Sequence, residues 1–191
     1  MDDLAQGAQE RMPTSTRQDR FLALLDGHKK SLFKIASSYC REPADREDLI
    51  QEMILQIWRS FDRYDDRYRF STWMYRVALN VAISFYRGER RRAHIIVPAD
   101  DSIPEIAAEA PASAALEDDL RLLHRFIDQL DELDRALVVL YLDGNRYDTI
   151  AEVLGISETN VGTKISRIKQ TLRLDWAGHL AEANATWNST T

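Results

Sequence analysis

The sequence predicts an all-α protein made of two small helical domains, joined by a flexible acidic linker. Residues 21–92 and 116–176 carry apolar side chains at helical spacing and show no alternating pattern of a β-strand. Between them, residues 95–115 contain Pro98, Pro104 and Pro111 and many alanines, which is typical of a linker. The chain has 191 residues, of which 45% are hydrophobic, and we therefore expect it to fold.

The expected organisation has five parts. They are a disordered N-terminus (1–17), a first domain (18–94), the linker (95–115), a second domain (116–176) and a C-terminal tail (177–191). The stretch between His94 and Arg121 carries seven acidic residues and no Lys or Arg, a local charge of −7, and a solvated spacer is its simplest interpretation. The Asn/Thr-rich end favours a frayed tail, although Trp176, Leu180 and Trp187 could continue one face of a helix.

Composition excludes several classes of protein. The net charge of −6 argues against indiscriminate binding to nucleic acid, so DNA contacts need a local basic patch or a partner. Cys40 is the only cysteine and the four histidines lie far apart, so we expect no disulfide, no metal site and no cofactor. No apolar run is long enough for a membrane helix, and residues 1–20 lack a signal-peptide core, so we expect a cytoplasmic protein.

Residues 147–161 have the spacing of a helix-turn-helix. Ala151 is small enough for two helices to cross closely, Gly155 suits a left-handed turn, and Ser157 can cap the next helix. The apolar residues Val161 and Ile165 then recur on one inward face. The alternative is a tight helical hairpin with a solvated polar face.

The opposite face of this second helix is the candidate duplex-reading surface. Its hydroxyl, amide and cationic groups suit base edges and phosphates. The candidate residues are Ser157, Thr159, Asn160, Thr163, Lys164, Ser166, Arg167 and Gln170.

A helix is also predicted for residues 45–61, with one apolar and one polar face. The polar face contains Asp45, Asp48, Glu52, Gln56 and Arg59. Such a face is often only solvated; its carboxylates could also suggest a metal, but no matching Glu-x-x-His pair occurs on another helix.

Residues 70–92 predict a longer helix with two distinct faces. The core face contains Phe70, Met74, Val77, Val81 and Phe85. The other face contains Trp73, Arg76, Asn80, Ser84, Arg87 and Arg91. An aromatic ring, an amide and several guanidiniums together suit single-stranded or distorted DNA, because rings stack on bases and cations hold phosphates. The alternative is a solvated cationic surface with Trp73 in the core.

The loop before this helix alternates charged and aromatic side chains. Its candidate DNA-binding residues are Tyr64, Arg67, Tyr68 and Arg69, and the loop could hold an extruded base. After the loop and most of the helix, residues 87–92 carry four arginines against Glu89, a net charge of +3 in an acidic protein.

Taken in order, these segments resemble the sigma-70 family, specifically its extracytoplasmic-function group. The resemblance lies in residues 45–58, in Phe70-Ser-Thr-Trp-Met-Tyr-Arg-Val-Ala-Leu-Asn80, in the arginine cluster, in the linker and in the helix-turn-helix. It spans about residues 21–174 and implies sigma domain 2, then a linker in place of domain 3, then sigma domain 4.

The resemblance implies the function of a transcription initiation factor, with core RNA polymerase and promoter DNA as partners. The helix from Asp45 to Trp58, with its residues Asp45, Asp48, Gln51, Glu52 and Gln56, would dock on the β′ clamp helices. The helix from Phe70 and the loop before it would read and open the minus-10 element, and the helix from Ser157 would read the minus-35 element, while its domain contacts the β flap. The acidic linker would thread toward the active-site cleft as a mimic of nucleic acid. Many members of this group are held inactive by an anti-sigma factor, which is a further candidate partner.

Two alternatives compete with this interpretation. The first is a free-standing regulator that binds an operator as a dimer through the helix-turn-helix, but it leaves the first domain unexplained. The second is an enzyme of the helical carboxylate-metal class. Its nucleophile–base pairs, Gly-rich phosphate loops and ligand-spaced histidines are missing from the sequence, so we expect no enzyme.

Overall fold

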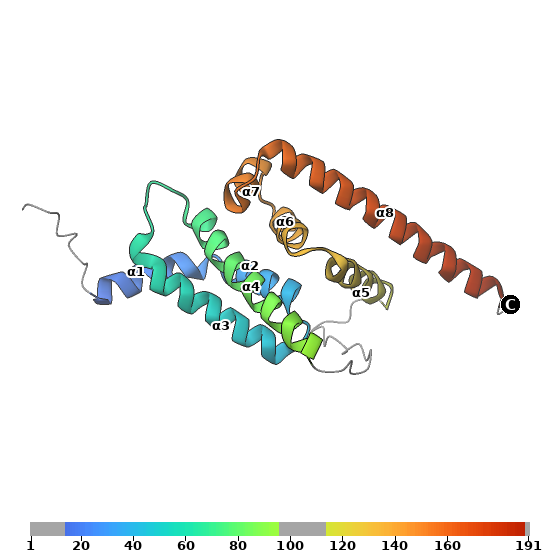
Figure 1. The fold of residues 1–191 in the computed structure, drawn as a ribbon, viewed down its shortest axis with the longest axis horizontal. Helices are drawn as coiled ribbons and strands as arrows, with labels where there is room; N and C mark the ends of the chain where they lie inside the picture. Colours follow the sequence, from blue (N-terminus) through green and yellow to red (C-terminus); the bar gives the residue numbers. More distant parts are fainter. Residues whose placement is uncertain (1–13, 96–113, 190–191) are drawn as a thin grey trace, which may run out of the picture.

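The computed structural model describes the backbone of residues 14–95 and 114–189 and the side chains of residues 16–89 and 122–178. Within these ranges the regular structure is helical, as predicted, with no strand. The first group of helices consists of α1 (Thr14–Asp26), α2 (Lys29–Tyr39), α3 (Pro43–Ser60), the 3₁₀ turn η1 (Phe61–Arg63) and α4 (Phe70–Ile95). The second group consists of α5 (Ala114–Gln129), α6 (Glu132–Leu142), α7 (Tyr147–Leu154) and α8 (Glu158–Ser189). Figure 1 shows the two groups side by side.

Both ends of the described chain are more helical than the sequence suggested. Residues 14–17, which we expected in a disordered N-terminus, belong to α1, where Arg17 donates a hydrogen bond to the carbonyl of Trp58. At the other end α8 continues to Ser189, so the expected fraying is wrong over residues 177–189 (Figure 1). Four alanines in that stretch favour a helix. The expectations for residues 1–13 and for the linker residues 96–113 lie outside the described residues.

The core of the first group is an apolar stripe on α3 packed against α2 and α4. Leu49, Met53 and Ile57 recur at every fourth position and are fully buried. Pro43 stands in the first turn of α3, where its missing N–H costs no hydrogen bond. The helix passes at Phe61 directly into η1, which leads into the loop before α4.

The second group contains the predicted helix-turn-helix. Gly155 ends α7 in the left-handed region, with φ 69°. Ser157 accepts a hydrogen bond at its Oγ from the backbone N–H of Asn160, at 3.2 Å, so it caps α8 as predicted. Val161 and Ile165 are buried on the inner face of α8. The alternative of a simple helical hairpin is not needed, because the turn and the cap have the geometry that the motif requires.

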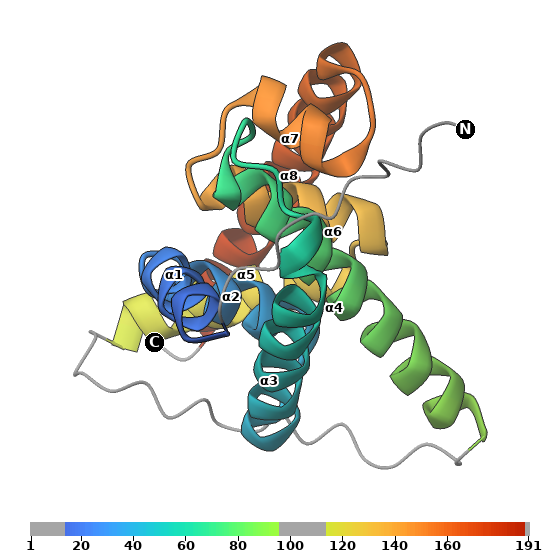
Figure 2. The same ribbon diagram turned by 90° about the vertical axis from the view of Figure 1, so that its left-hand side faces the viewer.

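The two groups of helices share one continuous core. α2 contacts α5 and α6, α4 contacts α7, and the views in Figures 1 and 2 agree on this side-by-side packing. We call this contact between the two groups the seam. Its centre is Arg135 of α6, whose side chain is 1% exposed.

Arg135 is held by groups from both sides of the seam. Its Nη1 donates a hydrogen bond to the carbonyl of Ser38 at 3.0 Å, and its Nη2 donates one to the carbonyl of Asp128 at 3.0 Å. The guanidinium lies 4.4 Å from the centroid of the Tyr86 ring. Beside it, the Tyr39 hydroxyl donates to the carbonyl of Glu132 at 3.0 Å. Burial raises the pKa of Tyr39 far above its usual value, so this hydroxyl keeps its proton.

The buried surface of α4 differs from the predicted core face. Its buried residues are Phe70, Thr72, Met74, Tyr75, Ala78, Leu79 and Ala82. The expected core residues Val77, Val81 and Phe85 are only half-buried, at the edge of the core. The prediction was therefore only partly right. It considered the first domain alone, whereas α4 packs against α2 and α3 on one side and against α7 on another.

Candidate nucleic-acid interface

The loop between η1 and α4 is built around the ring of Tyr64. This ring stacks on Phe61, with centroids 5.9 Å apart and planes at 18°, and lies 5.2 Å from the centroid of Trp73. The Tyr64 hydroxyl donates to the carbonyl of Tyr68 at 2.8 Å, which closes the loop. Tyr64 and Trp73 are both half-buried. These two rings therefore support the loop from the side that faces the core. Trp73 has part of the core role that the sequence left as an alternative.

Three other candidate residues of the loop are exposed. The Tyr68 side chain is 59% exposed, and Arg67 and Arg69 are exposed on either side of it. Arg67 donates from Nε to Oδ2 of Asp65 at 2.8 Å, so part of its charge is already neutralised. Of the two tyrosine rings in this loop, Tyr68 is thus the exposed one.

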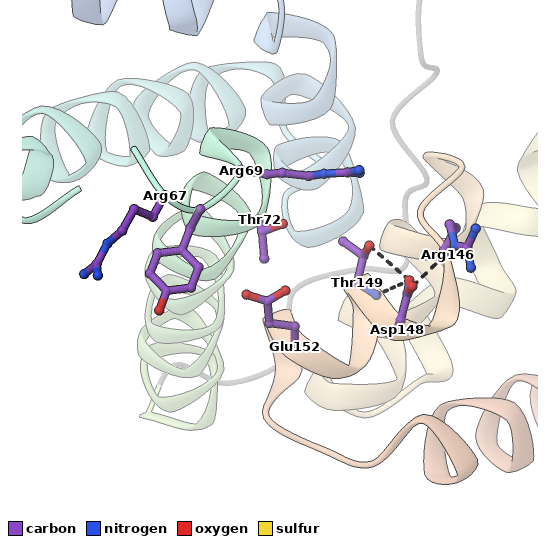
Figure 3. A pocket seen from close by; sticks show the side chains of 8 residues that line it. Arg67, Arg69, Thr72, Arg146, Asp148, Thr149 and Glu152 are labelled. Atoms are coloured by element: carbon purple, nitrogen blue, oxygen red, sulfur yellow. Dashed lines mark hydrogen bonds and ion pairs between the residues drawn. The ribbon is translucent and has the colours of Figure 1, made fainter. Parts of the chain in front are cut away.

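An open pocket of about 520 Å³ lies between this loop and α7 (Figure 3). It is lined by Arg67, Tyr68, Arg69, Thr72, Arg146, Asp148, Thr149 and Glu152. Figure 3 shows that Arg67 points away from α7, while Asp148 is held by the backbone and hydroxyl of Thr149 and by Arg146. Sequence reasoning missed the contribution of α7, because it treated the two domains separately.

The predicted DNA-facing side of α4 is partly covered by the second group of helices. Arg76 donates a hydrogen bond to the backbone carbonyl of Glu152 in α7. Arg87 pairs with Glu132, with Nε and Oε1 3.4 Å apart. Asn80 is exposed, and Ser84 is exposed with its hydroxyl bonded to the carbonyl of Asn80 at 2.8 Å. The side chain of Arg91 lies outside the described residues.

The candidate face of α8 is exposed except at one position. Its exposed residues are Ser157, Thr159, Asn160, Thr163, Ser166, Arg167 and Gln170. Lys164 instead is half-buried and forms an ion pair with Asp134 of α6. The outward orientation expected for Lys164 is therefore not what the structure shows, because the carboxylate of α6 attracts the ammonium across the domain.

The polar face of α3 is exposed throughout. Its solvent-facing residues are Asp45, Asp48, Gln51, Glu52 and Gln56. Glu52 has an opposite charge nearby in Arg59, two turns later, with Oε1 and Nη1 3.8 Å apart. An ion pair at this distance between exposed groups contributes little to folding. This face is consequently available to a basic partner.

Two further residues, both on α1, belong to the site although the sequence gave no sign of them. Arg17 lies in an ion pair with Asp62, with Nε and Oδ1 2.7 Å apart, and Arg20 pairs with Asp66. Both carboxylates belong to η1 or the loop after it. No sequence motif signals these contacts, since the partners are more than forty residues apart.

Two searches of the described residues are negative. No group of three His, Cys, Asp or Glu side chains there lies close enough to bind a metal ion together. None of the helices described is both long and apolar enough to cross a membrane.

Both domains match known families. Residues 24–92 match Sigma-70 region 2, and residues 120–172 match Sigma-70, region 4. The ECF RNA polymerase sigma factor SigW of Bacillus subtilis is 25% identical over 170 residues, which cover 82% of this chain and 88% of SigW. The ECF RNA polymerase sigma factor SigE of Mycolicibacterium smegmatis is 30% identical over 164 residues, which cover 83% of this chain and 62% of SigE.

Two solved structures have the same fold. CnrH in complex with the cytosolic domain of CnrY superimposes with a TM-score of 0.64 at 22% identity, covering 86% of this chain and 92% of that one. The sigma factor RpoE in complex with the anti-sigma factor NepR from Bartonella quintana gives a TM-score of 0.61 at 21% identity, covering 86% and 98%.

The two matched regions, in this order on an all-α fold, define a transcription initiation factor. The chain belongs to the sigma-70 family of RNA polymerase sigma factors, as a member of the extracytoplasmic-function group. It accordingly binds core RNA polymerase and promoter DNA and acts in transcription initiation.

The exposed guanidinium of Arg167 allows a test of the α8 face. We expect Arg167→Ala to weaken promoter recognition by about 1 to 3 kcal/mol if the side chain reads a base. If the side chain contacts only phosphate, binding to all promoter sequences should weaken equally. The slope of log affinity against log salt concentration should then fall by about one unit. Binding of holoenzyme to matched and mismatched minus-35 sequences at several salt concentrations measures both the sequence discrimination and the salt slope. Arg173→Ala, at an exposed position further along α8, is the control, and an Arg167→Ala variant that binds like it would contradict the assignment.

Proposed function

We propose that this sigma factor uses three separate surfaces to bind core polymerase, the minus-10 element and the minus-35 element. The polar face of α3 docks on the β′ clamp helices of core polymerase, the loop of residues 64–69 and the adjoining face of α4 read and open the minus-10 element, and the exposed face of α8 reads the minus-35 element. The observation that carries this proposal is that these faces project from the two matched regions with their polar side chains largely exposed.

We propose the corresponding domain boundaries as well. Sigma domain 2 comprises residues 18–94 and sigma domain 4 comprises residues 116–176, joined by the linker of residues 95–115, and the tail follows from residue 177. The chain thus works as an initiation factor and not as an enzyme, in the cytoplasm with the polymerase.

The alternative of a free-standing dimeric regulator is disfavoured. Such a protein would need only the helix-turn-helix, whereas residues 24–92 match a second sigma region that accounts for the first group of helices. Sigma domain 4 also contacts the β flap in this proposal, which a free-standing regulator has no reason to do.

We also propose an anti-sigma factor as a partner. RpoE of Bartonella quintana binds the anti-sigma factor NepR, and CnrH binds the cytosolic domain of CnrY, and both have the fold of this chain.

The acidic face of α3 gives the first test of this division. Replacing both Asp48 and Glu52 by Lys should weaken the affinity for core polymerase, because attraction to a basic surface becomes repulsion. Thermal unfolding should change little, since exposed charges contribute about 0 to 1 kcal/mol. A variant with Asp19→Lys and Glu47→Lys carries the same change in charge at other exposed positions and is the matched control. Equal core affinities of the two variants would remove the docking role from this face.

The loop and α4 are tested on opened DNA. We expect Tyr68→Ala and Asn80→Ala, in the holoenzyme, to impair promoter melting more than formation of the closed complex. Unstacking bases costs a few kcal/mol, and stacking on an aromatic ring returns about 1 to 3 kcal/mol per base. Permanganate footprinting measures the melting.

The decisive comparison uses a promoter already mismatched across the minus-10 region. Its unpairing cost has been removed beforehand, so it should rescue much of the defect. Defects of the same size on paired and mismatched templates would mean that Tyr68 and Asn80 do not drive opening.

A further inference from the structure

The N-terminal helix α1 holds the loop that presents Tyr68. One turn of α1 supplies Arg17, Arg20 and Phe21, which share a face because they are spaced by three and four residues. The ring of Phe21 is buried, with its centroid 5.0 Å from that of Trp58 and 5.3 Å from that of Phe61. This packing fixes α1 against the end of α3 and the start of the loop.

Arg17 makes three contacts at this junction. Its Nη2 donates to the carbonyl of Trp58 at 2.9 Å, its guanidinium lies 3.8 Å from the centroid of the Trp58 ring, and its Nε lies 2.7 Å from Oδ1 of Asp62. The Arg17 side chain is only 22% exposed. The arginine therefore ties the last turn of α3 to the first acidic residue of η1.

Arg20 reaches further along the loop. It forms an ion pair with Asp66, two residues before Tyr68, and its guanidinium lies 5.7 Å from the centroid of Phe61. The segment from Asp62 to Arg69 carries three Asp and three Arg, so its own net charge is zero. Arg17 and Arg20 add the positive charge that offsets two carboxylates close to a surface for DNA phosphates.

We propose that Arg17 and Arg20 are positioning residues for minus-10 recognition, which fix the loop so that Tyr68 meets a displaced base and mask the carboxylates of Asp62 and Asp66. This inference rests on the proposed role of the loop. Neither arginine needs to contact DNA, because both act through the loop.

A double-mutant cycle on Arg20 and Asp66 tests the inference in the holoenzyme. The variants are Arg20→Gln, Asp66→Asn and the two combined, and the measurement is the affinity for a single-stranded oligonucleotide that carries the minus-10 sequence. We expect Arg20→Gln to lower the affinity about twofold to fivefold, as for loss of one exposed ion pair. The double variant should be no weaker than Arg20→Gln alone, and Arg20→Lys should restore most of the affinity.

Controls separate this inference from its premise. Gln18→Ala on the same helix should bind like the unchanged protein, and core affinity should stay constant for every variant. If Tyr68→Ala weakens binding but Arg20→Gln does not, or if the effects of Arg20→Gln and Asp66→Asn simply add, the positioning role is overturned. If Tyr68→Ala itself has no effect, the proposed function of the loop fails instead.

Discussion

The buried guanidinium of Arg135 is the constraint on which the relation between the two domains depends. Burying a charged group that is 1% exposed is costly unless its donors find acceptors; both terminal nitrogens of the guanidinium do so, while Nε is buried without a hydrogen-bond partner. Here the carbonyls of Ser38 and Asp128 and the ring of Tyr86 supply that environment, and two of these three groups belong to sigma domain 2. Separation of the domains therefore exposes Arg135 to water, which solvates a cation well. The guanidinium therefore makes its buried contacts only while the two domains stay packed together.

The position of α4 follows from this seam and explains why its three roles overlap. The same helix supplies core residues to sigma domain 2, a cover for α7 and a candidate DNA surface. Small side chains at Ala78 and Ala82 let the neighbouring helices approach closely, while Arg76 and Asn80 remain on the outside. A helix that meets partners on several sides has few positions left that serve only one of them.

These features also mark how far the sequence could predict the structure. The helix-turn-helix was predictable, because Gly155 and Ser157 act on their own neighbours in the chain. The stripe on α3 was predictable from its period. The sequence could not predict the burial of Arg135, whose partner Ser38 is 97 residues away, or the turn of Lys164 toward Asp134. Such contacts depend on how helices are placed in space, and periodicity describes only one helix at a time. The roles of the candidate residues in binding remain predictions.

Charge pairing within the chain lowers the attraction between its candidate DNA surfaces and phosphates. Several cations on the candidate surfaces have an internal acceptor: Arg67 has Asp65, Lys164 has Asp134, Arg87 has Glu132, and Arg76 has a carbonyl of α7. A paired cation attracts phosphates less strongly than a free one, because the neighbouring carboxylate cancels part of its field. Nonspecific affinity, which depends on the number of phosphates neutralised, is then low for the free chain. Arg76 and Arg87 lie on α4 and contact α7 and α6 of the other domain, so the positive field of α4 is reduced while the two domains are packed together.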